Sequence, residues 1–143
     1  MSKKKNNVNE IPRITLEQAE KAVRKHKFEI KAGDGIYTKK DQKKADDFEK
    51  KHGFRYEDAW NLDHAIAVFV LPRLVQLRDT AHGYPAEFID NGDYEAWLKT
   101  LDQIIYGFYI YVTKDLIFWD DEDKKIWFRA KSLFCRHFSG LWD

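Results

Sequence analysis

A single cysteine, Cys135, leaves this sequence without the pair of thiols that an internal disulfide requires. The chain also lacks an excess of either charge, because it has 25 lysines and arginines and 24 aspartates and glutamates. No global field therefore draws the chain to nucleic acid or to an anionic membrane. No apolar run is long enough to cross a bilayer, and the first residues, MSKKKNNV, lack the apolar segment of a secretion signal. Because an unpaired thiol suits a reducing compartment, we expect a cytoplasmic protein.

The chain is rich in the residues that build a core. Apolar residues make up 43% of its 143 positions and aromatic residues 15%, which excludes disorder of the whole chain. We predict a disordered basic tail over residues 1–10 and a single helical domain over residues 11–143. Within that domain, residues 11–53 form an N-terminal extension and residues 54–143 form the helical core.

Two capping boxes, which begin at Thr15 and Thr38, predict the starts of two helices in the extension. The first helix is expected to end near His26 and the second at Gly53. Between them, alternating apolar and polar residues at 28–37 predict a small β-hairpin. Lysines and carboxylates alternate along the second helix, so we interpret it as a solvent-facing, salt-bridged surface rather than a basic binding face.

The stretch WNLDHAIAVFVLPRL predicts the central element of the fold. Its apolar run, AIAVFVL, places apolar side chains on every side of a helix, which we expect to be buried all round over residues 61–80. Asn61 is the expected N-cap. Pro72 lacks a backbone donor and predicts a kink, at which a neighbouring arginine can satisfy a freed carbonyl. The fold class is therefore mainly α, a compact helical domain around a buried, Pro-kinked helix.

Two more helices, at residues 93–114 and 121–139, are expected to pack against the central one. The first carries more aromatic area than its core face needs, at Tyr106, Tyr109 and Tyr111, so another helix or an oligomer partner should cover it. Leu141 and Trp142 are expected to fold back onto the core. The buried stripe of the last helix is expected to consist of Ile126, Trp127, Ala130, Leu133, Phe134, Cys135 and Phe138.

The sequence contains no strong catalytic or metal-binding signature. The acidic run at 120–123 lacks the ligand spacing of a calcium loop and is explained by the dipole of the helix that it opens. Cys135 and His137 are two positions apart and point to different sides of a helix, which argues against a thiol nucleophile with a histidine base. We therefore expect no metal, no cofactor and, on balance, no enzymatic activity.

Polar residues that flank the central helix are the remaining candidates for binding. Arginine and histidine beside aromatic residues can recognise a phosphate or a carboxylate, although the same residues can equally cap helices and form ion pairs. The candidate ligand- or partner-binding residues are Asp63, His64, Arg73, Arg78, His82, Tyr84, Tyr106, Tyr109 and Tyr111.

The order of four segments, WNLDHAIAVFVLPRL, HGYP, LDQIIYGF and LFCRHFSGLWD, resembles an uncharacterised family of small bacteriophage and prophage proteins. The resemblance covers residues 48–143. It implies a phage setting, in the cytoplasm of an infected cell, and no particular activity.

We therefore expect a non-enzymatic phage accessory protein that binds a host or phage macromolecule, in the role of a counter-defence inhibitor. A protein partner fits best, and a homo-oligomer is compatible with the aromatic surplus. One alternative is a protein that binds a small ligand or nucleotide through Arg73, Arg78, His82 and Tyr84. Another is a weak nucleic-acid binder that uses the lysines at 3–5 and 39–51.

Overall fold

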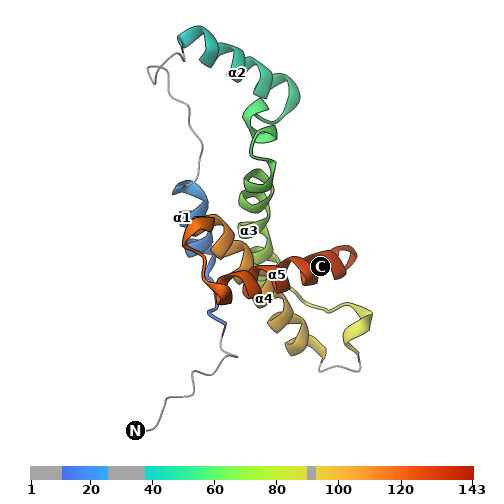
Figure 1. The fold of residues 1–143 in the computed structure, drawn as a ribbon. Coiled ribbons are helices and arrows are strands. Elements are labelled where there is room, and N and C mark those ends of the chain that lie inside the picture. Colours follow the sequence, from blue (N-terminus) through green and yellow to red (C-terminus); the bar gives the residue numbers. More distant parts are fainter. Residues whose placement is uncertain (1–10, 26–37, 90–92) are drawn as a thin grey trace.

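The computed structural model of the protein describes residues 11–25, 38–89 and 93–143. Within these ranges the chain forms helices and no strand, which confirms the mainly α prediction, and the hairpin predicted at 28–37 lies outside the described residues. The α-helices are α1 Leu16–Lys25, α2 Lys39–His52, α3 Leu62–Thr80, α4 Asp93–Thr113 and α5 Asp121–Arg136 (Figure 1). Short 3₁₀ turns are η1 Tyr56–Ala59, η2 Ala86–Phe88, η3 Leu116–Phe118 and η4 Phe138–Gly140.

Local hydrogen bonds explain where the helices begin. Before α1, the backbone N–H of Thr15 donates to the Gln18 side chain at 2.9 Å, and the N–H of Gln18 donates to the Thr15 hydroxyl at 3.2 Å. The same reciprocal arrangement opens α2 at Thr38, so the two predicted capping boxes are confirmed, and a third, which was not predicted, opens α5 at Asp120. Asn61 precedes α3 as expected, but its side chain makes no capping bond.

The core is organised around α4, which packs against α1, α3 and α5. Its inward face buries Trp97, Leu101, Ile104, Ile105, Phe108 and Val112. The helices α4 and α5 approach each other closely at Gly107, where a Cβ atom would lie 2.1 Å from the Cβ of Ala130. Only hydrogen at Gly107 and a methyl group at Ala130 let the two backbones pack at this distance.

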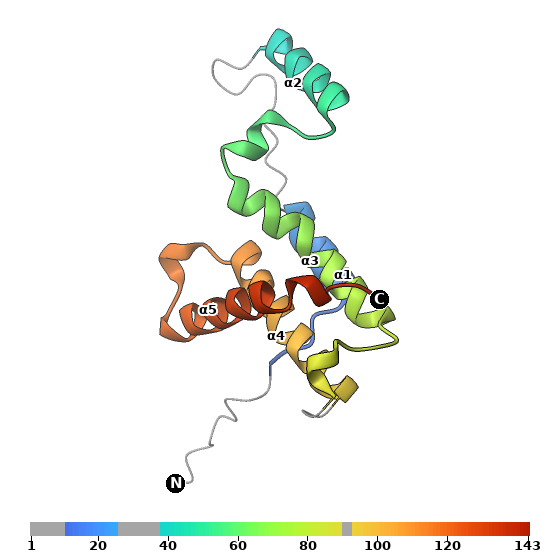
Figure 2. The ribbon, with the colours of Figure 1, turned by 90° about the vertical axis from the view of Figure 1, so that its right-hand side faces the viewer.

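The expectation that α3 is buried on every side is wrong for its N-terminal half. Its C-terminal half is covered by α1 and α4, and Leu71 and Val75 are 0% exposed. The other half rises beyond these helices toward α2, as Figures 1 and 2 both show. A seven-residue apolar run spans nearly two turns, so it places apolar side chains on every face whether or not a neighbour covers that face.

The helix α3 runs unbroken through Pro72. The guanidinium of Arg73 donates to the carbonyl of Phe69 at 2.8 Å, one position along from the carbonyl that proline leaves without its usual donor. An arginine therefore bonds a carbonyl at this turn, but the acceptor is Phe69 and not Val68, whose carbonyl is the one that Pro72 leaves without a backbone donor.

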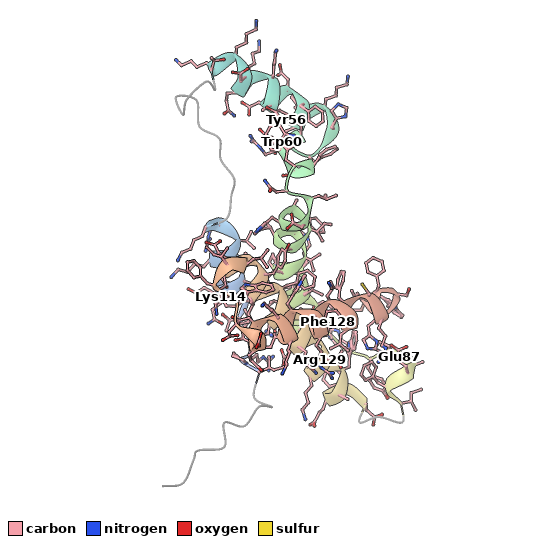
Figure 3. The ribbon with its side chains drawn as sticks, viewed as in Figure 1. Tyr56, Trp60, Glu87, Lys114, Phe128 and Arg129 are labelled. Carbon is pink, nitrogen blue, oxygen red and sulfur yellow. The ribbon has the colours of Figure 1, made fainter. Side chains whose placement is uncertain are left out.

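At the other end of the molecule, α2 and η1 form an arm, defined here as residues 38–61. The ring of Phe48 packs edge-on against Phe54 and Tyr56, with centroids 5.5 and 5.7 Å apart, and Tyr56 packs in turn against Trp60 (Figure 3). The arm stands away from α4 and α5 in both Figures 1 and 2. Its aromatic contacts hold α2 on η1, which leads directly into α3.

The predicted stripe of α5 is partly wrong. Ala130 is buried, and Trp127, Leu133 and Phe134 pack against the core, but Cys135 is exposed and Phe138 is 64% exposed. The α-helix ends at Arg136 and is followed by the 3₁₀ turn η4, so Phe138 does not lie on the buried stripe of α5. Leu141 packs against the core as expected, whereas Trp142 is 75% exposed, contrary to expectation.

Candidate functional site

Three of the candidate residues come together where the start of α3 meets the end of α4. The hydroxyl of Tyr111 donates a hydrogen bond to the carboxylate of Asp63, and the ring of His64 lies 5.5 Å from the Tyr111 ring. This hydrogen bond lowers the pKa of Asp63. Burial, together with the bond to Asp63, raises the pKa of Tyr111 to about 12. Tyr111 also packs against Trp127 of α5 at 4.4 Å, so it connects three helices.

Arg78 is buried and its nitrogens are engaged by the protein itself. Its side chain is 2% exposed, and it donates to Asp102 at 2.8 Å, to Asp79 at 3.0 Å and to the carbonyl of Ile14 at 2.6 Å. These bonds join α3 to α4 and to the residues that precede α1. Because every nitrogen of the guanidinium already has a partner within the protein, Arg78 stabilises the fold and is not available to bind a ligand.

The structure does not gather Arg73, Arg78, His82 and Tyr84 into one site. Arg73 lies on the exposed face of α3, with its guanidinium 3.7 Å above the ring of Phe69, whereas Arg78 points into the protein. Five positions along a helix turn a side chain by about 140°, which separates the two arginines. His82 is engaged with Asp143, and Tyr84 is 42% exposed.

Tyr106 and Tyr109 are half-buried and pack against the core, as Tyr111 does. The predicted surplus of aromatic surface on α4 is therefore covered in large part by this chain. Large exposed apolar side chains lie elsewhere, mainly on the first half of α3, on η3 and on the outer side of α5.

The HGYP loop and the LWD segment, which are far apart in the sequence, bind each other. The backbone N–H of His82 donates to the Asp143 carboxylate at 2.9 Å, and these bonds from His82 lower the pKa of Asp143. Nearby, a Cβ at Gly140 would lie 2.9 Å from a ring carbon of Pro85. We call this contact between residues 82–87 and 137–143 the C-terminal clasp.

A pocket of about 480 Å³ lies beside the clasp. One wall carries His137, which is 7% exposed, bonds through Nδ1 to the carboxylate of Glu87, and packs against the rings of Phe88 and Trp97 at 5.2 and 5.7 Å. A carboxylate on one imidazole nitrogen fixes the ring and leaves the other nitrogen for a ligand. The pocket is lined by Glu87, Phe88, Thr100, Leu133, Arg136 and His137.

Sequence reasoning missed this pocket because its walls come from η2, α4 and the end of α5. Glu87 and His137 are 50 positions apart, and no local spacing indicates that they meet. Its lining combines two apolar residues with four polar or charged ones, and its volume lies in the size range of small-molecule sites.

A second surface consists of large apolar side chains that face water on α3. Leu62, Ile66 and Phe69 are 57%, 47% and 59% exposed, and their spacing places them on one side of the helix. We call these three residues the α3 stripe. Trp60, which is 63% exposed and is labelled in Figure 3, lies two residues before the start of the stripe.

Among the described residues, no three His, Cys, Asp or Glu side chains are grouped so as to hold a metal ion. The acidic run that opens α5 has structural partners: Asp120 caps the helix, and Lys114 binds Asp123 and lowers its pKa. No helix in the described part of the chain is long and apolar enough to cross a membrane.

Comparisons with protein-family models, with curated proteins and with solved structures found no match to this chain.

Proposed function

We propose that this protein is a non-enzymatic binding protein that holds a protein partner on the α3 stripe. The exposure of Leu62, Ile66 and Phe69 along one side of the helix is the observation that supports the proposal. Apolar residues at positions i, i+4 and i+7 are the anchors by which a helix docks into a groove of another protein. Complete burial of such a side chain contributes about 1.5–3 kcal/mol, so covering these half-exposed ones would contribute about 1 kcal/mol each.

The residues at both ends of the stripe support the same function. Trp60 adds a large exposed aromatic ring, and tryptophan is enriched among residues that dominate binding energy. At the other end, Arg73 covers the ring of Phe69 and also bonds the Phe69 carbonyl, which restricts both side chains before any partner arrives. A surface ordered in advance loses less entropy when it binds.

The biological setting is the part of the proposal that depends on sequence resemblance. The resemblance to small bacteriophage and prophage proteins suggests action in an infected cell, where a binding protein that covers a host surface would act as a counter-defence inhibitor. The α3 stripe supplies the means of binding in this proposal, and no chemical step is required of the protein.

Affinity capture from infected cells tests the proposal. The tagged protein is compared with a Leu62→Asp/Phe69→Asp variant and with a control variant, Ile117→Asp/Phe128→Asp, which changes two apolar residues away from α3 that are even more exposed. We expect the wild type and the control to recover the same partner and the stripe variant to lose it. Equal recovery by all three proteins, or recovery of a partner by none, would overturn the proposal.

The pocket beside the clasp favours a second candidate function, the binding of a small anionic molecule. Arg136 and His137 line it, and both can contact an anionic group while Phe88 and Leu133 contact an apolar one. This set replaces the four residues that the sequence suggested. A thermal-shift screen with nucleotides and cyclic dinucleotides should then find a ligand that raises the melting temperature, and Arg136→Ala should abolish that rise.

A further inference from the structure

The lysines of α2 occupy one side of the helix, although they alternate with carboxylates in the sequence. At about 100° per residue, all six fall within an arc of about 140°. Asp47 is the one acidic residue inside that arc, and Asp41, Asp46 and Glu49 lie outside it. We call this surface the lysine face; it consists of Lys39, Lys40, Lys43, Lys44, Lys50 and Lys51.

The lysine face is the outer side of the arm. The opposite side of α2 carries Ala45, which is 0% exposed, and Phe48, which packs against η1. All six lysines are exposed, and none of them forms an ion pair with another residue in the described ranges. Figure 3 shows nitrogen-tipped side chains that fan outward from α2 at the end of the molecule. The prediction that α2 faces solvent is therefore confirmed, while the predicted salt bridges of its lysines are not formed within the described ranges.

We propose that the lysine face binds the phosphate backbone of duplex DNA without reading its sequence. Lys39 and Lys51 are 12 positions apart, which corresponds to about 18 Å along the helix. Duplex DNA carries one negative charge per about 1.7 Å of its axis, so about ten phosphate charges lie within that length. The match is one of charge and spacing, and it is local because the chain as a whole is almost neutral.

The composition of the face indicates which polyanion it fits. Lysine acts on a phosphate as a point charge, and the face lacks the arginine, asparagine and glutamine side chains that read base edges. A helix that lies on a membrane needs large apolar side chains beside its lysines, and the arc contains none, since Phe48 is used against η1. Nucleic-acid backbone is therefore favoured over a lipid surface.

This binding site is separate from the α3 stripe and does not depend on the function proposed for it. The arm leads into α3 through η1, so a partner on the stripe and a duplex on α2 would occupy successive parts of the same projecting segment (Figure 1).

Fluorescence anisotropy with a short labelled DNA duplex and the full chain tests the proposal. If all six lysines contact phosphates, log Kobs should fall with log salt concentration with a slope of about −5. A Lys39→Gln/Lys43→Gln/Lys50→Gln variant should lose affinity about tenfold or more and reduce the slope by about 2.7. Glutamine is a good helix former, and circular dichroism should show that α2 is retained.

A matched control removes the same charge elsewhere. The Lys99→Gln/Lys124→Gln/Lys125→Gln variant changes three exposed lysines outside the arm, and it should keep the wild-type slope. Equal losses in the two variants would mean that only net charge matters and would overturn the proposal. Failure of the wild type to bind the duplex would also overturn it, and binding of anionic lipid vesicles in that case would assign the face to a membrane surface instead.

Discussion

The backbone N–H of His82 donates to one carboxylate oxygen of Asp143 at 2.9 Å, while the His82 imidazole lies 3.0 Å from the other oxygen. One carboxylate thus joins the loop after α3 to the segment after η4. The neighbouring pair of Glu87 and His137 joins η2 to the end of α5, and both residues also line the pocket.

Asp143→Asn should weaken the clasp at neutral pH and have little effect in acid. The bonds from His82 lower the pKa of Asp143 below its unfolded value of 3.8, so folding favours the charged form. This contribution to stability is fully present above pH 3.8 and is lost as the pH falls through the lowered pKa. Melting temperatures of the two proteins should therefore differ at pH 7 and converge below pH 3.8. A difference that persists unchanged in acid would contradict this assignment.

Arg78→Ala should destabilise the protein by about 3–5 kcal/mol, because it leaves the partly buried Asp102 without its partner. Arg73→Ala serves as the control, since an exposed arginine stacked on an aromatic ring contributes only about 0.5–1 kcal/mol. Urea unfolding followed by circular dichroism measures both. Similar small losses in the two variants would mean that the bonds of Arg78 do not hold α3 and α4 together.

The helices could be predicted from the sequence because their signals are local. Thr15, Thr38 and Asp120 each bond a residue three positions away, so the capping pattern is complete before any tertiary contact forms. The end of α2 at Gly53, with φ +80°, is equally local, because glycine reaches that conformation without strain.

The exposed faces could not be predicted in the same way. The apolar run of α3 gives no preferred side, and only the positions of α1 and α4 decide that Leu71 is buried and Leu62 is exposed. The contact of Glu87 with His137 depends on how the chain returns after α5. The lysine face, in contrast, could have been predicted from the sequence. Placing the residues of α2 at about 100° intervals around the helix axis brings the lysines to one side, although they alternate with carboxylates in the linear sequence.

Gly107→Ala should destabilise the packing of α4 on α5 by about 1–3 kcal/mol, since the new methyl group would overlap the Cβ of Ala130. The double variant Gly107→Ala/Ala130→Gly moves the methyl group across the interface and should recover part of the loss. Gly83→Ala is the control, because a Cβ there meets nothing within 4 Å. Wild type, the two single variants Gly107→Ala and Ala130→Gly, and the double variant form a double-mutant cycle measured by thermal unfolding. Strictly additive losses would mean that the two positions do not touch.

Tyr111→Phe should remove the hydrogen bond between α4 and Asp63 of α3 while it keeps the packing of the ring on Trp127. The hydroxyl contributes about 0.5–1.5 kcal/mol through its bond to Asp63. Folding raises the pKa of Tyr111 from 10.0 to about 12, so its contribution is fully present below pH 10 and is lost as the pH rises through about 12. Spectrophotometric titration should find one tyrosine that ionises last in the wild type and is missing in the variant. Asp63→Asn should move that last ionisation step to lower pH, because burial alone would then oppose ionisation of Tyr111. An unchanged titration would mean that Asp63 does not bond Tyr111 in solution.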